Sequence, residues 1–331
     1  MKTKNTFILG IGISFALVFL IAWSATGLGD FRLTLLPDSG PAWYYWKLPS
    51  VSLWATITMW VGYTLHQILC WYFIYKLQHE KHKIQSGRIG KYNAALLIVN
   101  VVFSILHILQ TRFFYDGLAQ FVSVSSSQYS VIAMLILMLI LLNARRGLFF
   151  GKKVPLPKAA VSGIGKTHGY YISWAIVYTF WFHPMESTWG HLLGFFFMFI
   201  LMLQMSLAYT KVHTEIKWVT ILESFVALHG TVVALVAGQA LWSMFMFGFS
   251  MMFIVTGMYG VVRHKALRIT FTVAYLVMAV LVYSGILGTG HQIFQIHQIF
   301  WIPITLYGLV FVLVAIYKIA SKLFVKKKPS V

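Results

Sequence analysis

Long apolar runs follow one another from one end of the chain to the other. Each is close to the roughly 20 residues that an α-helix needs to cross about 30 Å of hydrocarbon. We expect ten transmembrane helices, at residues 7–28, 51–77, 92–113, 127–143, 168–182, 190–209, 218–237, 240–262, 269–287 and 300–319. The pattern predicts an all-α, polytopic membrane bundle of about ten helices that forms one integral membrane domain over residues 1–331.

Composition supports this interpretation because charge is too scarce to cover a water-soluble surface. The chain is 59% hydrophobic, has a mean hydropathy of +0.78 and is only 10% charged, against about 25% in ordinary soluble proteins. Cys70 is the only cysteine and lies inside an apolar run, so neither a disulfide nor a cysteine-based metal motif is expected. The first apolar run ends without an Ala-x-Ala-like site, which predicts a retained helix rather than a cleaved signal peptide.

The basic residues predict the orientation of the bundle. With a cytoplasmic N-terminus, only Arg32, Lys47 and Arg112 of the 26 lysines and arginines fall outside the predicted inner segments, in accord with the positive-inside rule. We therefore expect both termini in the cytoplasm and the protein in the inner (cytoplasmic) membrane. The net charge of +19 lies in short loops and in the tail that ends at Lys328, so the expected partner is the lipid bilayer and not nucleic acid.

Two loop regions carry further signals. Aromatic residues gather at the predicted outer interface, where amphipathic rings are favoured. They are Trp43, Tyr44, Tyr45, Trp46, Trp181, Trp189 and Trp242. The longest predicted inner loop, 145–166, carries basic residues beside Phe149 and Phe150. We interpret this loop as a topology anchor against anionic lipid headgroups, with a specific ligand site as the alternative.

Histidines are the main candidates for chemistry. Seven of the 12 fall in the predicted membrane core or on its outer side, where ionisable side chains are costly and usually face a bundle interior, a cavity or a cofactor. His66 and His229 lie at matching central depth on different helices, the arrangement of two axial ligands of haem b. The alternative for each is a packed histidine that hydrogen-bonds to a neighbour.

Histidines nearer the outer side are candidate ligands of a transition metal. They are His107, His183, His191 and His297. Of these, His183 and His191 bracket a short turn that also contains Glu186, one of only seven acidic residues. Glu186 has two possible roles. It could act in catalysis or orient a ligating histidine. The alternative is that it complements a helix dipole in a first turn that begins near Pro184.

Two further polar positions are candidate catalytic groups. His291 should share a helical face with Gln295 and Gln298 and line an outer vestibule, with an amphipathic interfacial turn as the alternative. Glu223, six residues before His229, could pass protons from the inner side to a central cofactor. Asp116 is expected to pair with Arg112.

Two classes of function follow from these patterns. No P-loop, dinucleotide fingerprint or nucleophile elbow is present in the sequence. The first hypothesis is a membrane redox protein or oxidoreductase that holds haem b or a histidine-bound transition metal and exchanges electrons with a redox partner or a quinone. The second is a proton-coupled transporter without a permanent cofactor, since ten spans would place the two halves of the chain in opposite orientations, as in inverted repeats.

Overall fold

The computed structural model describes residues 2–37, 39, 44–50, 52–84 and 87–324, and these residues form helices and turns without a β-strand. The longer helices are α1 (Thr3–Ser24), α3 (Leu53–Glu80), α4 (Lys91–Phe114), α5 (Val124–Arg146), α6 (Lys158–Phe182), α7 (Trp189–Ser206), α8 (Ile216–Val236), α9 (Trp242–Met252), α11 (Lys265–Tyr283) and α12 (Trp301–Phe324). The shorter ones are η1 (Ala25–Gly27), α2 (Gly29–Leu33), η2 (Lys81–Lys83), η3 (Leu118–Gln120), η4 (Val212–Thr214), η5 (Phe253–Gly257), α10 (Met258–Val261) and η6 (Ile293–Phe300). The predicted all-α bundle is confirmed. Trp43 and the lysines after Lys322 lie outside the described residues.

Each of the ten predicted spans overlaps a helix. Among the described residues, eight helical segments are long and apolar enough to cross a bilayer, so the chain is a multi-pass membrane protein. Helices α3 and α6 are not among the eight, because they carry Trp, Tyr and His where a typical span has aliphatic side chains. The number of ten crossings and the cytoplasmic location of both termini stay predictions.

Two helical boundaries differ from the predicted ones. The span predicted at 240–262 begins at Trp242, after a turn in which Gly238 adopts a positive φ of 65°, and it contains the π-helical turn η5. The entrance to α12 is the 3-10 helix η6, and His291 precedes it. The expectation that His291, Gln295 and Gln298 share one α-helical face was therefore based on the wrong helical geometry.

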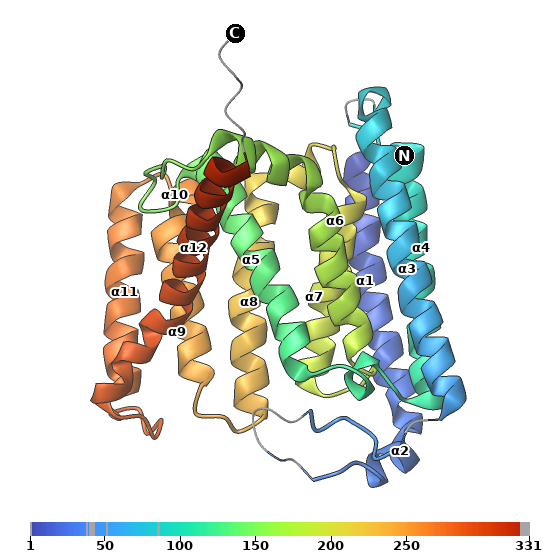
Figure 1. The fold of residues 1–331 in the computed structure, drawn as a ribbon. Helices are drawn as coiled ribbons and strands as arrows, with labels where there is room; N and C mark the ends of the chain where they lie inside the picture. The colour runs from blue at the N-terminus through green and yellow to red at the C-terminus, as the bar shows by residue number, and fades with distance from the viewer. Residues whose placement is uncertain (1, 38, 40–43, 51, 85–86, 325–331) are drawn as a thin grey trace. The chain divides into compact units, whose positions relative to one another are not determined.

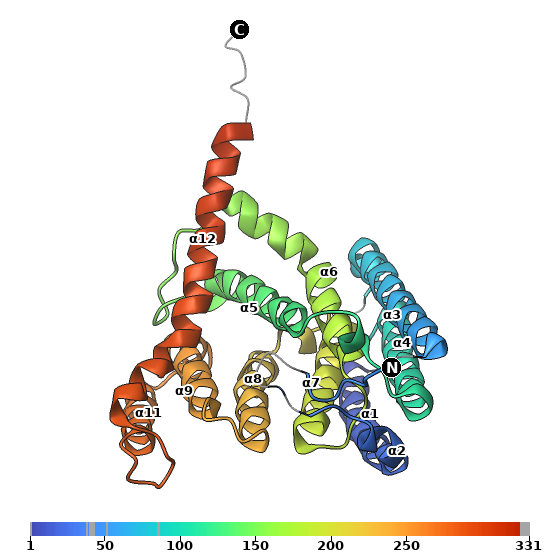
Figure 2. The same ribbon diagram turned by 60° about the horizontal axis from the view of Figure 1, so that its bottom comes forward.

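The chain divides into two compact units. The first contains Met1–Ala133 and Gly169–Phe225, and the second contains Met134–His168 and Val226–Val331. In the first unit, α3 packs along α4 and α1 packs along α7, as both views show (Figures 1 and 2). Glycines permit two close approaches there, since Gly10 of α1 lies against Leu203 of α7 and Gly62 of α3 lies against the Trp181 ring of α6.

In the second unit, α9 contacts α11, α12 and η6 (Figure 2). The apolar centre of this unit is formed by Phe247, Ala279, Val282, Tyr283 and Ile299. The loop after α5, the start of α11 and the end of α12 lie at the same end of this unit (Figure 1). The single membrane domain expected from hydropathy stays a prediction, because each unit has its own packed interior.

Candidate functional site

The string from His183 to His191 connects α6 to α7 in the first unit. Helix α7 begins at Trp189, and the Thr188 side chain caps it by accepting a hydrogen bond from the backbone N–H of His191 at 3.3 Å. Ser and Thr are favoured at this position because they satisfy one of the free N–H groups of the first turn. The predicted first turn near Pro184 is therefore wrong, and Glu186 lies before the helix instead of inside it.

Two imidazoles of this string converge on one phenol. The Tyr44 hydroxyl oxygen lies 2.6 Å from Nδ1 of His183 and 3.3 Å from Nε2 of His191. The two imidazole ring centroids are 5.6 Å apart. A tyrosine hydroxyl has a single proton and can donate to only one of the two nitrogens. We name Tyr44, His183 and His191 the Tyr–His–His cluster.

The other ring nitrogen of His191 is also engaged. Its Nδ1 lies 2.8 Å from the Thr188 hydroxyl oxygen, so the residue that caps α7 also orients the imidazole. Histidine ligands of metals commonly have such a partner on the second nitrogen, which fixes the direction of the first. The local sequence of the α7 N-terminus thus directs Nε2 of His191 toward Tyr44.

Glu186 is fully buried and forms an ion pair with Arg32 of α2. The Arg32 guanidinium donates to the carboxylate at 2.5 Å and 3.1 Å, and also to the Ser187 hydroxyl at 3.1 Å. This hydrogen-bonded carboxylate raises the pKa of Arg32. Burial, and secondarily the charge of Glu186, raises the pKa of Tyr44 well above its usual value, so the phenol is neutral at pH 7.

His107 lies next to this cluster. Its Nε2 donates to the backbone carbonyl of His183 at 3.0 Å, and its ring stacks on Trp181 with centroids 4.3 Å apart. Its contact is therefore with the backbone of His183 and not with the ring. The structure brings together four of the residues predicted from sequence, namely His107, His183, Glu186 and His191.

His66 is a fully hydrogen-bonded core histidine. The indole N–H of Trp181 donates to its Nδ1 at 3.2 Å, so the proton of the neutral ring is on Nε2, which donates to Asn100 Oδ1 at 3.0 Å. Neither ring nitrogen is free to bind iron unless Trp181 or Asn100 moves. The surroundings of His66 therefore do not fit an axial haem ligand.

A buried polar stripe on α4 was missed by the sequence interpretation. Asn93, Asn100 and His107 recur every seven residues on this helix, with Ser104 and Thr111 between or beyond them, and all five are buried. Asn100 Nδ2 donates to the Ser206 hydroxyl at 3.0 Å, and Asn93 Nδ2 donates to two carbonyls at the end of α7. The spacing of seven within an apolar run was the available signal.

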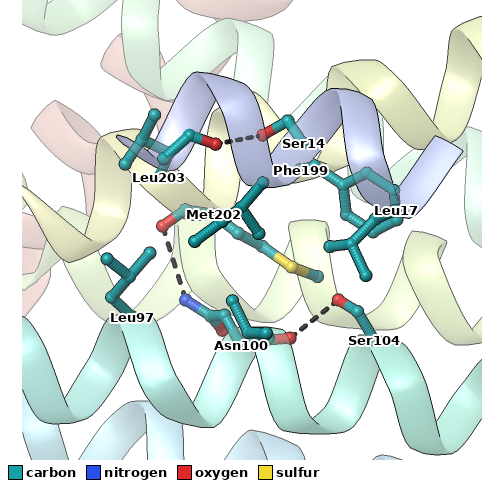
Figure 3. A pocket seen from close by; sticks show the side chains of 11 residues that line it. Ser14, Leu17, Leu97, Asn100, Ser104, Phe199, Met202 and Leu203 are labelled. Atoms are coloured by element: carbon teal, nitrogen blue, oxygen red, sulfur yellow. Dashed lines mark hydrogen bonds between the residues drawn. The ribbon is translucent and has the colours of Figure 1, made fainter. Parts of the chain in front are cut away.

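A small cavity lies beside this stripe, between α1, α4 and α7 (Figure 3). Its volume is about 20 Å³, and about 10–15 Å³ is enough for one water molecule. Ser14, Asn100 and Ser104 form its polar wall, and the Ser14 and Ser104 hydroxyls donate to carbonyls of their own helices. Their oxygen lone pairs can accept from a water molecule.

The remaining candidates lie elsewhere. Glu223 and His229 are both half-buried on α8, but Glu223 belongs to the first unit and His229 to the second. His291 is buried in the second unit, where its ring contacts Trp242 and Tyr283. His297 is exposed, and its Nδ1 lies 2.7 Å from the Phe294 carbonyl. His291 and His297 thus have different environments.

Asp116 does not pair with Arg112. It is 1% exposed, and neither carboxylate oxygen has a hydrogen-bond partner among the described residues. The Arg112 guanidinium lies against Gly27 instead. Burial raises the pKa of Asp116 to about 7, and the nearby Gln120 side chain opposes the shift only in part.

Within the part of the chain that the structure describes, no three His, Cys, Asp or Glu side chains are grouped to hold a metal ion. No protein-family model, curated protein or solved structure matches the chain.

Proposed function

We propose that the chain is a multi-pass inner-membrane metalloprotein of the redox class, with a transition-metal ion held on the outer side by Tyr44, His183 and His191. The observation that carries this proposal is the convergence of two imidazole nitrogens on one phenol oxygen, at 2.6 Å and 3.3 Å. The three side chains come from the loop before α3, from the start of the α6–α7 connection and from the first turn of α7.

The separations suit ligands of one ion. Ligands about 2.0–2.1 Å from a tetrahedral metal are about 3.3 Å from one another, which equals the distance from Tyr44 to His191. The shorter distance to His183 is that of a hydrogen bond and would lengthen once the phenol proton left. Imidazole and oxygen ligands together suit copper, iron or zinc, and the redox class requires copper or iron.

The surrounding residues support this arrangement. Thr188 orients the His191 imidazole, and the ion pair between Glu186 and Arg32 holds α2 against the α6–α7 connection. Because the pKa of Tyr44 is raised, binding of a metal by its oxygen should release one proton. A redox partner or a quinone stays the expected electron-exchange partner.

Metal binding to the purified full-length protein tests this proposal. We expect metal-depleted protein to bind about one Cu(II) per chain in calorimetric titration, and His183→Ala or His191→Ala to weaken binding at least about 10- to 100-fold. Tyr44→Phe should weaken binding and abolish proton release, measured as the dependence of the heat on buffer ionisation enthalpy. Glu186→Gln should retain the metal.

His297→Ala is the matched control, because this imidazole is exposed and its polar and ring contacts among the described residues are with its own helical turn and the neighbouring Trp301 ring. Its Cu(II) affinity should equal that of the wild type. Equal losses in His297→Ala and His183→Ala, or no binding by folded wild-type protein, would contradict the proposal. Thermal unfolding of every variant separates loss of the site from loss of the fold.

A proton-coupled transporter is the second candidate, and the buried polar stripe of α4 favours it. Polar side chains inside membrane bundles commonly mark pathways for protons or polar substrates. In that case Asn100→Leu should abolish proton uptake by proteoliposomes, whereas His183→Ala should not. Activity of metal-free protein would favour this candidate over the metalloprotein.

Binding of haem b by His66 and His229 as axial ligands stays a prediction. The hydrogen bonds around His66 do not support it. The absorbance spectrum of the purified protein tests it directly. A Soret band that disappears in both His66→Ala and His229→Ala would establish the pair, and its absence in the wild type would end the hypothesis.

A further inference from the structure

The charged residues of the chain are divided unequally between the two units. All seven acidic residues fall in the first unit, so the sequence of the second unit contains lysines and arginines but no aspartate or glutamate. The basic side chains of the second unit therefore have no carboxylate side chain within that unit to neutralise them. A basic surface of this kind attracts an anionic partner.

Part of this charge is carried by a loop that is hydrogen-bonded into place. The Asn143 side chain donates to the carbonyl of Val154 and accepts from its N–H, both at 2.9 Å. Gly147 and Gly151 have φ angles of 78° and 80°, which are accessible to glycine without strain. Residues 147–154 thus form a closed loop at the end of α5, which we name the basic loop.

The basic loop is attached to the π-helical turn η5. A π-turn leaves backbone carbonyls free of the usual helical partner, and Val255 O accepts here from the N–H of Phe150 at 2.8 Å. The Thr256 hydroxyl donates to the Leu148 carbonyl at 2.7 Å. The π-turn therefore has a structural role, which is to attach the loop to the second unit.

Basic and aromatic side chains are adjacent on this surface. Lys152 and Lys153 are exposed, and so are Arg263, which lies between α10 and α11, and Lys265, the first residue of α11. The ring of Tyr259 connects the two segments. Phe150 packs on it with centroids 5.9 Å apart, and the Arg268 guanidinium lies 4.5 Å from its centroid.

We propose that the basic loop, together with Arg263, Lys265 and Arg268, binds the headgroup of an anionic phospholipid in the predicted cytoplasmic leaflet. The lipid is favoured over a soluble anion because Phe150 is 55% exposed beside the lysines. An apolar ring next to ammonium groups suits the boundary between acyl chains and headgroups. The positive-inside rule requires charge on this side but not an ordered loop, so the hydrogen bonds to η5 point to a defined site.

Native mass spectrometry of the delipidated full-length protein tests this inference. With phosphatidylglycerol or phosphatidylcholine added in detergent, we expect tighter retention of phosphatidylglycerol by the wild type. The double substitution Lys152→Gln and Lys153→Gln should weaken that affinity roughly 10-fold or more and leave phosphatidylcholine binding unchanged.

The matched control is Lys211→Gln with Lys217→Gln, two exposed lysines of the first unit on the same predicted side. It should retain the wild-type affinity for phosphatidylglycerol. An equal loss of phosphatidylglycerol affinity in both double variants, or equal retention of the two lipids by the wild type, would overturn the proposal. Either result would show that binding depends on overall charge and not on a defined site. Full displacement of phosphatidylglycerol by an equal concentration of inorganic phosphate would show a free-anion site instead. Thermal unfolding without lipid verifies that both variants fold.

Discussion

His66 and His183 belong to the same unit but differ in what their ring nitrogens contact. Both nitrogens of His66 are hydrogen-bonded to neutral side chains of the helix interior. Nδ1 of His183 faces an oxygen that a second imidazole also approaches. The first arrangement satisfies a buried polar ring at low cost, whereas the second places three potential metal ligands together. Burial alone does not distinguish the two roles.

Asp116 gives a prediction at the residue scale. Its pKa rises from 3.8 to about 7 in the folded protein because of burial, so the folded state binds the proton more tightly than the unfolded state. Its contribution to stability is fully present below about pH 4 and is lost as the pH rises toward 7. Asp116→Asn should therefore raise stability by roughly 2–4 kcal/mol at pH 8 and have little effect near pH 4.

Thermal unfolding in detergent between pH 4 and pH 8 measures this effect as the difference in Tm between variant and wild type. Parallel Tm profiles across the range would contradict the assigned pKa. Because Asp116 has no ion-pair partner among the described residues, the substitution removes a carboxylate without leaving a buried cation unpaired.

At the scale of elements, α4 is the helix that organises the first unit. One face carries its polar stripe toward α3 and α7, and the helix ends at Phe114, where Tyr115 adopts a positive φ of 68°. The chain then turns so that Gly117 lies against the backbone of Phe182, directly before His183. The end of α4 and the end of α6 are thereby held together beside the Tyr–His–His cluster.

Gly117→Ala tests this contact. An added Cβ would lie 2.5 Å from the carbonyl oxygen of Phe182, and a backbone atom cannot move aside as a side chain does. We expect a destabilisation of about 1–3 kcal/mol and weaker Cu(II) binding, because the backbone that carries His183 must shift. The measurements are Tm and calorimetric affinity. Gly12→Ala is the control, since a Cβ there meets nothing within 4 Å, and a Tm for Gly117→Ala equal to that of this control would contradict the contact.

At the scale of the whole molecule, the charge distribution predicts the topology. Reporter fusions after Ser39 and Ser125 should be active only outside the cytoplasm, and a fusion at the C-terminus should be active in the cytoplasm. The physical reason is the retention of lysine- and arginine-rich loops on the cytoplasmic side during insertion. An external C-terminus would mean that the number of crossings is odd.

The sequence by itself determined that this is a helical membrane protein and approximately where its helices lie. Hydropathy is a local sum over about 20 residues, and within a bilayer an apolar segment must satisfy its backbone hydrogen bonds internally, which favours a helix. Interruptions of the α-helix, such as the π-turn η5, leave the summed hydropathy almost unchanged. The η5 and η6 segments were therefore assigned ordinary α-helical geometry.

Only the tertiary structure decided which polar side chains meet. Tyr44 contacts His183 across 139 residues of sequence, and Arg32 contacts Glu186 across 154. Such pairings depend on how several helices are rotated and packed. Counting residues along each helix gives no information about that rotation or packing. Depth along the membrane normal was estimated from sequence, and it suggested pairing His66 with His229. Packing sets the direction of each ring and the partners of its nitrogens. These contacts identify His66 as a core residue and Tyr44 as a candidate metal ligand.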